Sequence, residues 1–156
     1  MQGGEDIQLL VFRLDDRPYA VELARVRKVF RAAAINPLPL GPRVICGVLN
    51  MRGRPVPVAD LRLRLGLPSR VTALEDRFLW VSADAMDLIL TCDSVDGVSV
   101  FPRSTMLDGA EIPERPPVLK GVVCLPDGVL YINDPDTLLN LREKEELAYA
   151  LAEHDE

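Results

Sequence analysis

The sequence predicts a mainly β protein that consists of two similar small barrels packed together in one domain. Many short stretches rich in Val, Ile and Leu are separated by Gly, Pro and Asp, which is the pattern of strands joined by turns. Long segments of helical period are few. Two parts of the chain also resemble each other at an offset of 74 residues, which separates Gly47 from Gly121 and Asp60 from Asp134. A groove between two such units is the natural place for a binding partner.

The first expected strand covers residues 7–14 and ends at a turn that contains Pro18. The chain then returns over residues 19–23 and completes a hairpin. Pro55 and Pro57 cannot donate hydrogen bonds to a neighbouring strand, so we expect their strand at an edge or at an end of a sheet. The remaining expected strands are bounded by turn residues and cover 44–50, 55–59, 77–83, 88–93, 95–101, 118–125 and 129–133.

Two short helices are expected after aspartates that can cap them. Asp60 can accept hydrogen bonds from the first amides of a helix over residues 61–65, which Gly66 can end in a left-handed conformation. Asp134, followed by a proline at the first helical position, repeats the arrangement ahead of a helix over residues 137–141.

The C-terminal part of the chain predicts a longer helix. Residues 143–153 contain no Gly or Pro and carry apolar residues at helical spacing, so they are expected to form an amphipathic helix. The segment 102–117, which contains four prolines, is expected to be an irregular connector.

Composition places the chain among globular proteins of about one domain. Its 156 residues are 48% hydrophobic and 27% charged. No apolar run approaches the roughly 20 residues that cross a bilayer, so direct membrane insertion is not expected. The N-terminus has no basic flank and no signal-like apolar core, which indicates a cytoplasmic protein.

Few residues are suited to catalysis or metal binding. Cys46, Cys92 and Cys124 lie in apolar stretches without a C-x-x-C spacing, so we interpret them as small buried residues of a reducing compartment. The only histidine is His154, which leaves no general base for a nucleophile in the body of the chain. Phosphate-loop and dinucleotide motifs are absent as well. We therefore expect no enzyme activity, no metal and no cofactor.

Charge is unevenly distributed along the chain. The formal net charge is −6, and residues 127–156 carry −7 of it, so the remainder carries +1. Between Arg43 and Arg70 there are six arginines and only one acid, Asp60. A nucleic-acid surface would add exposed aromatics and a basic domain, whereas aromatics are only 5% here. An acidic protein partner fits this segment better.

One group of motifs resembles a known family. The central segment contains Gly47-Val-Leu-Asn-Met-Arg-Gly53, followed by Pro55-Val-Pro-Val-Ala-Asp-Leu-Arg62 and Leu65-Gly-Leu67. It resembles the motif G-V-x-N-x-R-G-x-x-x-P-V-x-D-L-R of CheW-like domains. Further similar segments lie at residues 10–14, 19–23, 95–99, 119–122 and 138–139. The resemblance covers roughly residues 7–141 and leaves residues 142–156 as an acidic C-terminal helix or tail.

This resemblance implies a fold of two intertwined five-stranded SH3-like barrels. It also implies a non-enzymatic adaptor for chemotaxis, which holds a CheA-type histidine kinase, through its regulatory domain, to the cytoplasmic tips of chemoreceptors. Such a protein would be found at membrane-associated receptor arrays. No receiver or kinase domain is visible in the sequence, so the chain resembles the free-standing adaptor.

The resemblance assigns candidate contact residues for the receptor. Asn50 and Arg52 belong to the segment that borders the receptor groove in the family, although Asn50 can instead hydrogen-bond within the turn. Four valines correspond to apolar groove positions, with ordinary core packing as their alternative role: Val26, Val29, Val98 and Val100.

Two other residues correspond to the kinase contact. Cys46 and Pro55 match an end of the first barrel that packs against the regulatory domain of the kinase in the family. Ordinary packing or protection of a strand edge is the alternative role for both.

Lys28 departs from the family pattern. It stands where the family commonly has an acid that can pair with the motif arginine, so Lys28 and Arg52 would repel each other if they lay close together. Glu22 is a possible substitute partner, although strand alternation can place it on the other face. This departure favours a divergent receptor that presents an acidic group, or binding of the kinase alone.

Two other function classes remain open in the sequence. The arginines between residues 43 and 70 favour a small-barrel binder of nucleic acid or ligand. An enzyme that uses pairs of acids such as Asp93 and Asp96 is the other class, but the sequence supplies neither a nucleophile nor a set of metal ligands for it. Within the adaptor class, a scaffold of a non-chemotactic chemosensory pathway is the alternative.

Overall fold

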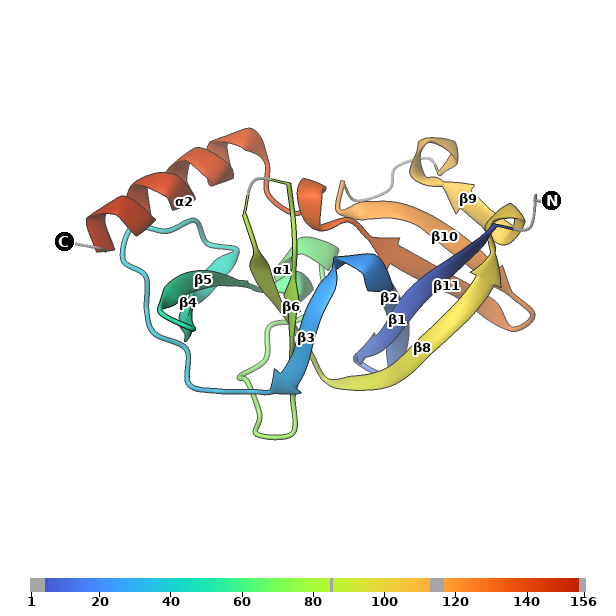
Figure 1. Cartoon of the computed structure of the whole chain (residues 1–156), viewed down its shortest axis with the longest axis horizontal. Helices are drawn as coiled ribbons and strands as arrows, with labels where there is room; N and C mark the ends of the chain where they lie inside the picture. The colour runs from blue at the N-terminus through green and yellow to red at the C-terminus, as the bar shows by residue number, and fades with distance from the viewer. Residues whose placement is uncertain (1–4, 85, 113–116, 155–156) are drawn as a thin grey trace.

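The structure is a computed structural model that describes residues 5–84, 86–112 and 117–154. It consists of two adjacent β-sheets, in which most strand pairs are antiparallel, and a C-terminal helix that lies along one flank (Figure 1). The six-stranded sheet has the order β8-β1-β2-β11-β10-β9, and the five-stranded sheet has the order β3-β6-β7-β5-β4. The chain starts in the six-stranded sheet, builds all of the five-stranded sheet, and then returns. The two sheets are therefore intertwined in sequence.

The strands of the six-stranded sheet come from both ends of the chain. They are β1 (Asp6–Leu14), β2 (Arg17–Glu22), β8 (Ser94–Pro102), β9 (Met106–Asp108), β10 (Leu119–Leu125) and β11 (Gly128–Asn133). Those of the five-stranded sheet are β3 (Val26–Arg31), β4 (Ile45–Met51), β5 (Arg54–Ala59), β6 (Arg77–Val81) and β7 (Leu88–Cys92). The helices are α1 (Leu61–Leu65) and α2 (Leu141–His154), with short 3₁₀ turns η1 (Leu23–Arg25), η2 (Arg103–Thr105), η3 (Gly109–Glu111) and η4 (Pro135–Thr137).

The predicted mainly β fold with two similar units is confirmed. Each sheet contains one hairpin from the repeat, β4–β5 or β10–β11. The second strand of this hairpin pairs in parallel with the second strand of another hairpin of the same sheet. The parallel partners are β7 for β5 and β2 for β11. Both hairpins carry a register shift next to the repeated glycine. The internal similarity of the sequence therefore reflects a similarity of topology.

Gly47 and Gly121 are repeated because a second backbone crosses each of them. A Cβ added at Gly47 would lie 2.2 Å from the carbonyl oxygen of Asn36, and one at Gly121 would lie 2.4 Å from that of Leu107. Asn36 forms a bridge to β4, just as β9 pairs with β10. Only glycine allows these close approaches.

Helix α1 confirms the capping prediction. The Asp60 side chain accepts a hydrogen bond from the Leu63 amide, and Gly66 ends the helix in the left-handed region with φ of 76°. The helix expected at residues 137–141 is wrong. Asp134 caps only the 3₁₀ turn η4, by accepting from the Asp136 amide, and α2 starts only at Leu141. The predicted C-terminal helix is confirmed as α2.

Other expectations need correction in detail. Strands β3 and β9 were not predicted, because three of the six residues of β3 are cations and β9 has only three residues. The segment 102–117 contains β9 and two 3₁₀ turns rather than a purely irregular connector, and its residues 113–116 lie outside the described part. Strand β5 is internal, but only Val58 and Ala59 pair with β7, so its prolines have a partner strand on one side alone.

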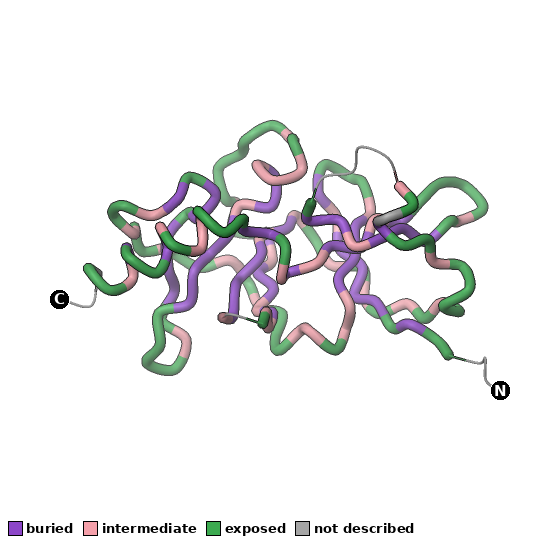
Figure 2. Tube along the Cα trace, turned by 90° about the horizontal axis from the view of Figure 1, so that it is seen from above, coloured by how far each residue is buried: buried purple, intermediate pink, exposed green. Residues whose placement is uncertain are grey.

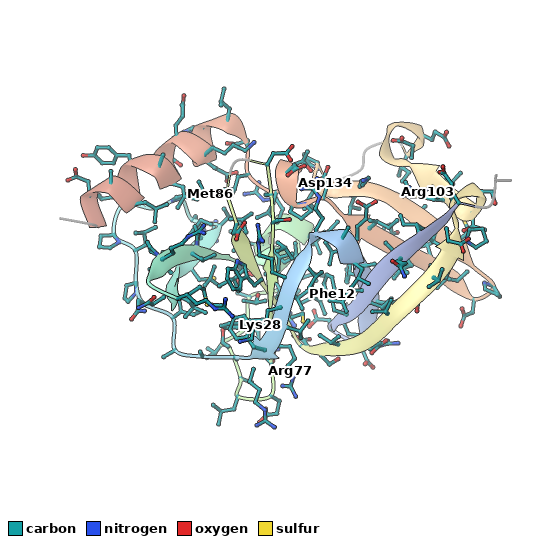
Figure 3. The ribbon with its side chains drawn as sticks, in the orientation of Figure 1. Phe12, Lys28, Arg77, Met86, Arg103 and Asp134 are labelled. Carbon is teal, nitrogen blue, oxygen red and sulfur yellow. The ribbon has the colours of Figure 1, made fainter. Side chains whose placement is uncertain are left out.

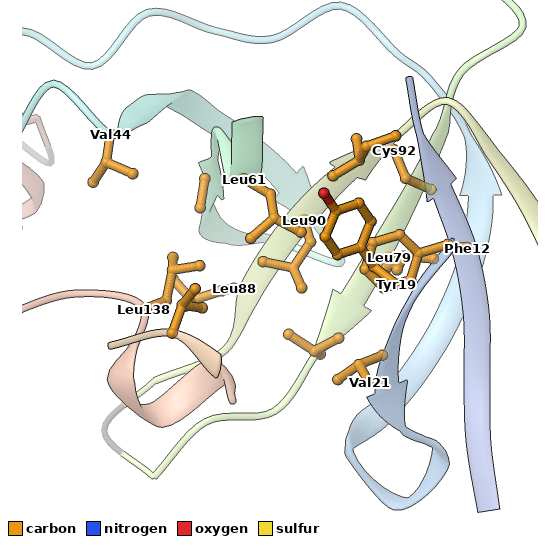
Figure 4. Packing of buried hydrophobic residues seen from close by; sticks show 14 of the residues in the cluster. Phe12, Tyr19, Val21, Val44, Leu61, Leu79, Leu88, Leu90, Cys92 and Leu138 are labelled. Atoms are coloured by element: carbon orange, nitrogen blue, oxygen red, sulfur yellow. The ribbon is translucent and has the colours of Figure 1, made fainter. Parts of the chain in front are cut away.

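The apolar core has three parts, and buried residues run through the middle of both sheets (Figure 2). Alternation along β1 joins two of them: Ile7, Leu9 and Val11 pack within the six-stranded unit, whereas Leu10, Phe12 and Leu14 belong to the cluster that both sheets share. This central cluster combines Phe12, Tyr19 and Val21 with Leu79, Leu88 and Leu90 of the five-stranded sheet (Figure 4). The two units therefore share one apolar core.

Candidate protein-interaction surfaces

Edge strand β8 presents apolar side chains to solvent. Every second residue of β8 is exposed, and Val98 and Val100 retain 51% and 53% of their accessible surface. On its one paired side β8 is hydrogen-bonded to β1, where Val98 lies opposite Leu10 and Val100 opposite Gln8. Both valines are therefore free for a partner rather than part of the core.

Edge strand β3 carries three of the predicted receptor-contact residues, which differ in how far they are exposed. Val26 lies opposite Val81 and packs against the central cluster, so half-buried packing is its role in this structure. Val29 is 38% exposed. Lys28 is exposed, and its ammonium lies 6.0 Å from the centre of the Phe30 ring. Val29 and Lys28 are thus the accessible residues of this strand among those predicted.

A shallow cavity lies beside Val100. It has a volume of about 310 Å³ and is lined by Asp6, Ile7, Gln8, Glu22, Ala24, Val100 and Arg103. It joins the edge of the six-stranded sheet to η1, the connection that leads into β3. The cavity includes only one of the predicted valines, and its lining is more polar than the predicted apolar groove.

The β4–β5 turn is rigid and exposed. Arg52 and Gly53 both have positive φ, 57° and 86°, as a two-residue hairpin turn of the mirror-image type requires. The Asn50 side-chain oxygen accepts a hydrogen bond from the Gly53 amide at 2.7 Å, so Asn50 does stabilise the turn. Arg52 is exposed and has no hydrogen bond or ion pair within the described residues.

The two predicted kinase-contact residues lie apart on this hairpin. Pro55 is directly opposite Asn50, near the turn, whereas Cys46 lies at the bulge near the start of β4. Desolvation raises the pKa of the Cys46 thiol to about 11, and the nearby Asp60 carboxylate adds to the effect. The thiol is therefore neutral at physiological pH and is not a reactive nucleophile. Cys46 and Cys124 are nevertheless exposed and only Cys92 is buried, which corrects the expectation of three buried cysteines.

Half of the arginines in the segment 43–70 are neutralised by carboxylates inside the fold. Arg62 binds Asp15 and Asp93 at 2.7 and 2.8 Å with only 7% of its side chain exposed. Arg70 binds Asp76 and also Asp93. Arg64 binds Glu143 of α2 at 2.6 Å. Three of the six arginines thus serve the fold, which reduces the positive charge that this segment offers to a partner.

The same ion pairs occupy the acids that an enzyme would need. Burial alone would raise the pKa of Asp93, but hydrogen bonds from the Asp15 amide and from Arg62 and Arg70 lower it below its usual value. Asp96 binds Arg13 at 2.9 Å. Within the described residues, no group of three or more His, Cys, Asp or Glu side chains could hold a metal ion, and no helix is long and apolar enough to cross a membrane.

The repulsion between Lys28 and Arg52 stays a prediction. Lys28 belongs to β3 and Arg52 follows β4, which are the two edge strands of the five-stranded sheet, and the chain that follows β3 bridges β4 at Asn36 and Val48. Neither forms an ion pair with any described residue. Glu22 is not their substitute partner, because its carboxylate binds Lys120 of β10 at 3.1 Å.

Comparisons with known proteins agree with this architecture. A sequence model of the CheW-like domain matches residues 8–143. Relatives named "Chemotaxis protein CheW" include one from Rhizobium meliloti, 29% identical over 103 residues, and one from Bacillus subtilis, 30% identical over 97 residues. The matches cover 60% and 56% of this chain and 65% and 62% of the relatives, so they span less than two thirds of either relative.

A solved structure shows the same fold. The scaffolding protein TtCheW from Thermoanaerobacter tengcongensis superimposes with a TM-score of 0.81 at 23% identity. The superposition covers 90% of this chain and 97% of that chain.

Proposed function

This chain belongs to the CheW-like domain family, and on that premise we propose that it is a non-enzymatic adaptor in bacterial chemosensory signalling. It couples chemoreceptors to a CheA-type histidine kinase by binding the cytoplasmic tips of the receptors and the regulatory domain of the kinase. The family match over residues 8–143 carries the proposal. We propose further that it acts in the cytoplasm, at membrane-associated receptor arrays, and without a cofactor.

An adaptor contacts two partners, and we assign one set of exposed residues to each. We propose that the exposed residues of β3 and β8, with Val98 and Val100 at their centre, contact the receptor. The outer face of the β4–β5 hairpin, from Cys46 to Pro55, contacts the kinase. Asn50 and Arg52 lie at the turn next to Pro55, so a receptor contact there has to border the kinase contact. Val29 and Lys28 complete the proposed receptor surface on β3, and the half-buried Val26 supports it from below.

The proposed domain is a CheW-like unit of residues 7–141 that carries an acidic helix or tail over residues 142–156. Leu147 and Ala150 of α2 are fully buried, and Arg64 of α1 binds Glu143. The helix is therefore docked on the body by apolar packing and one ion pair rather than projecting from it.

Binding measured by calorimetry tests the proposal. The purified chain is expected to bind both a receptor-tip fragment and the regulatory domain of the kinase, and all three are expected to co-elute in gel filtration. Absence of binding to either partner contradicts the coupling role. Binding of the kinase domain without any receptor fragment supports the alternative, a scaffold of a non-chemotactic pathway.

Pro55→Asp localises the kinase contact. A carboxylate buried in an apolar interface is expected to cost about 2 kcal/mol of binding free energy or more. Val129→Asp is the matched control, because Val129 lies 74 residues after Pro55 at the equivalent place of the β10–β11 hairpin and is 39% exposed. Equal affinities of the two variants and the wild type contradict this placement.

A further inference from the structure

The ends of β3 and β6 continue into an apolar groove that the family resemblance did not assign. The last pair of these strands is Arg31 opposite Arg77. Beyond it the Ala32 amide donates to the Asp76 carbonyl at 3.0 Å, and the two chains then separate. Between them lies a cavity of about 320 Å³, which is lined by residues Ala32 to Ile35 and Thr72 to Leu74.

The loop over residues 66–76, on one side of this groove, exposes large apolar side chains to solvent. It connects α1 to β6 and projects beyond the sheet at the bottom of Figure 1. Val71 and Leu74 of this loop are 88% and 84% exposed. Neither side chain belongs to an apolar cluster of the described residues, and large exposed apolar groups beside an apolar groove are typical of contact sites.

The same loop is firmly attached to the body. Arg70 binds Asp76 at 2.8 Å and also reaches Asp93, and the Ala73 amide donates to the Asp76 carboxylate at 2.8 Å. Because these bonds already order the loop, a partner that binds Val71 and Leu74 pays little additional conformational entropy.

Two uncompensated cations border the groove. Arg31 and Arg77 face each other across β3 and β6, and like charges directly opposite destabilise a sheet. Arg77 donates only to the backbone carbonyls of Glu75 and Asp76, and its position at the loop end of β6 is visible in Figure 3. In the described structure neither arginine has a carboxylate within 4.0 Å, although the exposed Glu75 lies nearby in sequence. A partner with carboxylates would remove this repulsion.

The groove is continuous with the Cys46 end of the β4–β5 hairpin. Thr72 lines both the groove and the small cavity that contains Cys46. Gly47, next to Cys46, lies against Ile35 and Asn36, which continue the other wall of the groove. Cys46 and the groove therefore form one surface rather than two.

We propose that the groove, the exposed Val71 and Leu74, and the Arg31–Arg77 pair form an extension of the kinase contact. This inference rests on the proposed function and adds the chemistry of the partner. The regulatory domain of the kinase presents aliphatic side chains to the groove and carboxylates to the two arginines. The charge pairs set mainly the association rate, and the apolar anchors set the lifetime of the complex.

Calorimetry of the full chain with the regulatory domain of the kinase tests this inference. Leu74→Asp is expected to weaken binding about tenfold or more, because a charge would enter the apolar contact. Arg31→Glu is expected to weaken binding several-fold at low salt and less at high salt, because exposed charges are screened. Val98→Asp on the proposed receptor surface and Arg17→Glu on β2 are matched controls, expected to stay within about twofold of the wild type.

The outcomes separate this inference from the proposed function. If the wild type binds the kinase domain but both groove variants bind equally well, the inference is overturned and the proposed function stands. If the wild type does not bind, both fall. If the groove variants lose binding of a receptor-tip fragment instead, the surface belongs to the receptor and the inference is wrong. Thermal unfolding of each variant verifies that the fold is intact, and Arg31→Glu, in an exposed position, remains informative if Leu74→Asp does not fold.

Discussion

Arg62 and Asp136 occupy equivalent positions in the two halves of the fold but carry opposite charges. They lie 74 residues apart, each two residues after the aspartate that caps a helical turn. Arg62 binds Asp93, which directly precedes β8. Asp136 binds Arg25, which directly precedes β3, at 2.6 Å. Equivalent positions of the repeat thus each form an ion pair with the residue directly before a strand. The repeat position is a cation in the first half and an anion in the second.

The turn contacts repeat the same inversion. Arg62 reaches Asp15 in the β1–β2 turn, and Asp136 accepts a hydrogen bond from the Asp84 amide between β6 and β7. Burial alone would raise the pKa of Asp136, but the bonds from Arg25 and from the Asp84 amide lower it. Each cluster joins an element of one sheet to a turn of the other, so the two clusters together hold the sheets in one relative orientation.

The Asp93 cluster is expected to contribute to stability. Asp93→Asn should lower the free energy of unfolding at neutral pH by on the order of 1–3 kcal/mol, because the buried Arg62 loses one of its two charged partners and Arg70 loses one as well. Asp96→Asn is the matched control, since the Arg13–Asp96 pair is exposed and should contribute at most about 1 kcal/mol. Equal denaturation midpoints of the two variants would contradict a structural role of the cluster.

The same cluster predicts a pH dependence. The folded-state pKa of Asp93 is lowered, so its contribution is fully present above the unfolded-state pKa of about 4 and is lost as the pH falls through the folded-state value. Wild type and Asp93→Asn should therefore converge in stability below about pH 4. Urea titrations between neutral pH and about pH 3 measure this, and a constant difference would argue against it.

The repeated glycines predict a steric effect that depends on position. Gly121→Ala should cost on the order of 2–3 kcal/mol, because the new Cβ would meet the Leu107 carbonyl. Gly128→Ala, on the neighbouring strand, has no atom within 4 Å of its new Cβ and should change stability by no more than about 0.5 kcal/mol. Chemical denaturation of both variants checks this, and an undisturbed Gly121→Ala would mean that β9 can move away.

Arg52→Ala separates a binding role from a structural one. Arg52 is exposed and has no bond within the described structure, so the free energy of unfolding should stay within about 0.5 kcal/mol. Binding of a receptor-tip fragment should weaken. Arg54→Ala, across the same turn, is the control for charge and should leave binding unchanged. A collapse of the melting temperature in Arg52→Ala would show that the turn itself needs the arginine.

Lys28→Glu tests whether the receptor has diverged. Lys28 has no acidic partner within the described residues, which favours an acidic group on the receptor itself. Lys28→Glu should then weaken binding several-fold, an effect that shrinks at high salt because an exposed pair is worth at most about 1 kcal/mol. Lys28→Gln should show an intermediate loss. Tighter binding by Lys28→Glu at both salt concentrations would instead indicate that the receptor presents a cation.

The local sequence determined several structural features of this protein. Strand segments, the Asp60 cap with Gly66, and the 74-residue repeat depend on neighbouring residues, and they are visible in the sequence. So is the family motif around Asn50 and Arg52. These features need no knowledge of distant contacts, because capping, alternation and turn geometry are set within a few residues.

Only the tertiary structure decided which residues meet. Strand β3 carries three cations in six residues and becomes a strand only because β6 pairs with it, and that pairing brings Arg31 opposite Arg77. Arg62 and Arg64 are surplus positive charge in the sequence, but Asp93 and Glu143 lie far along the chain and neutralise them. Side-chain partners at such separations follow from the path of the whole backbone, which the local sequence does not contain.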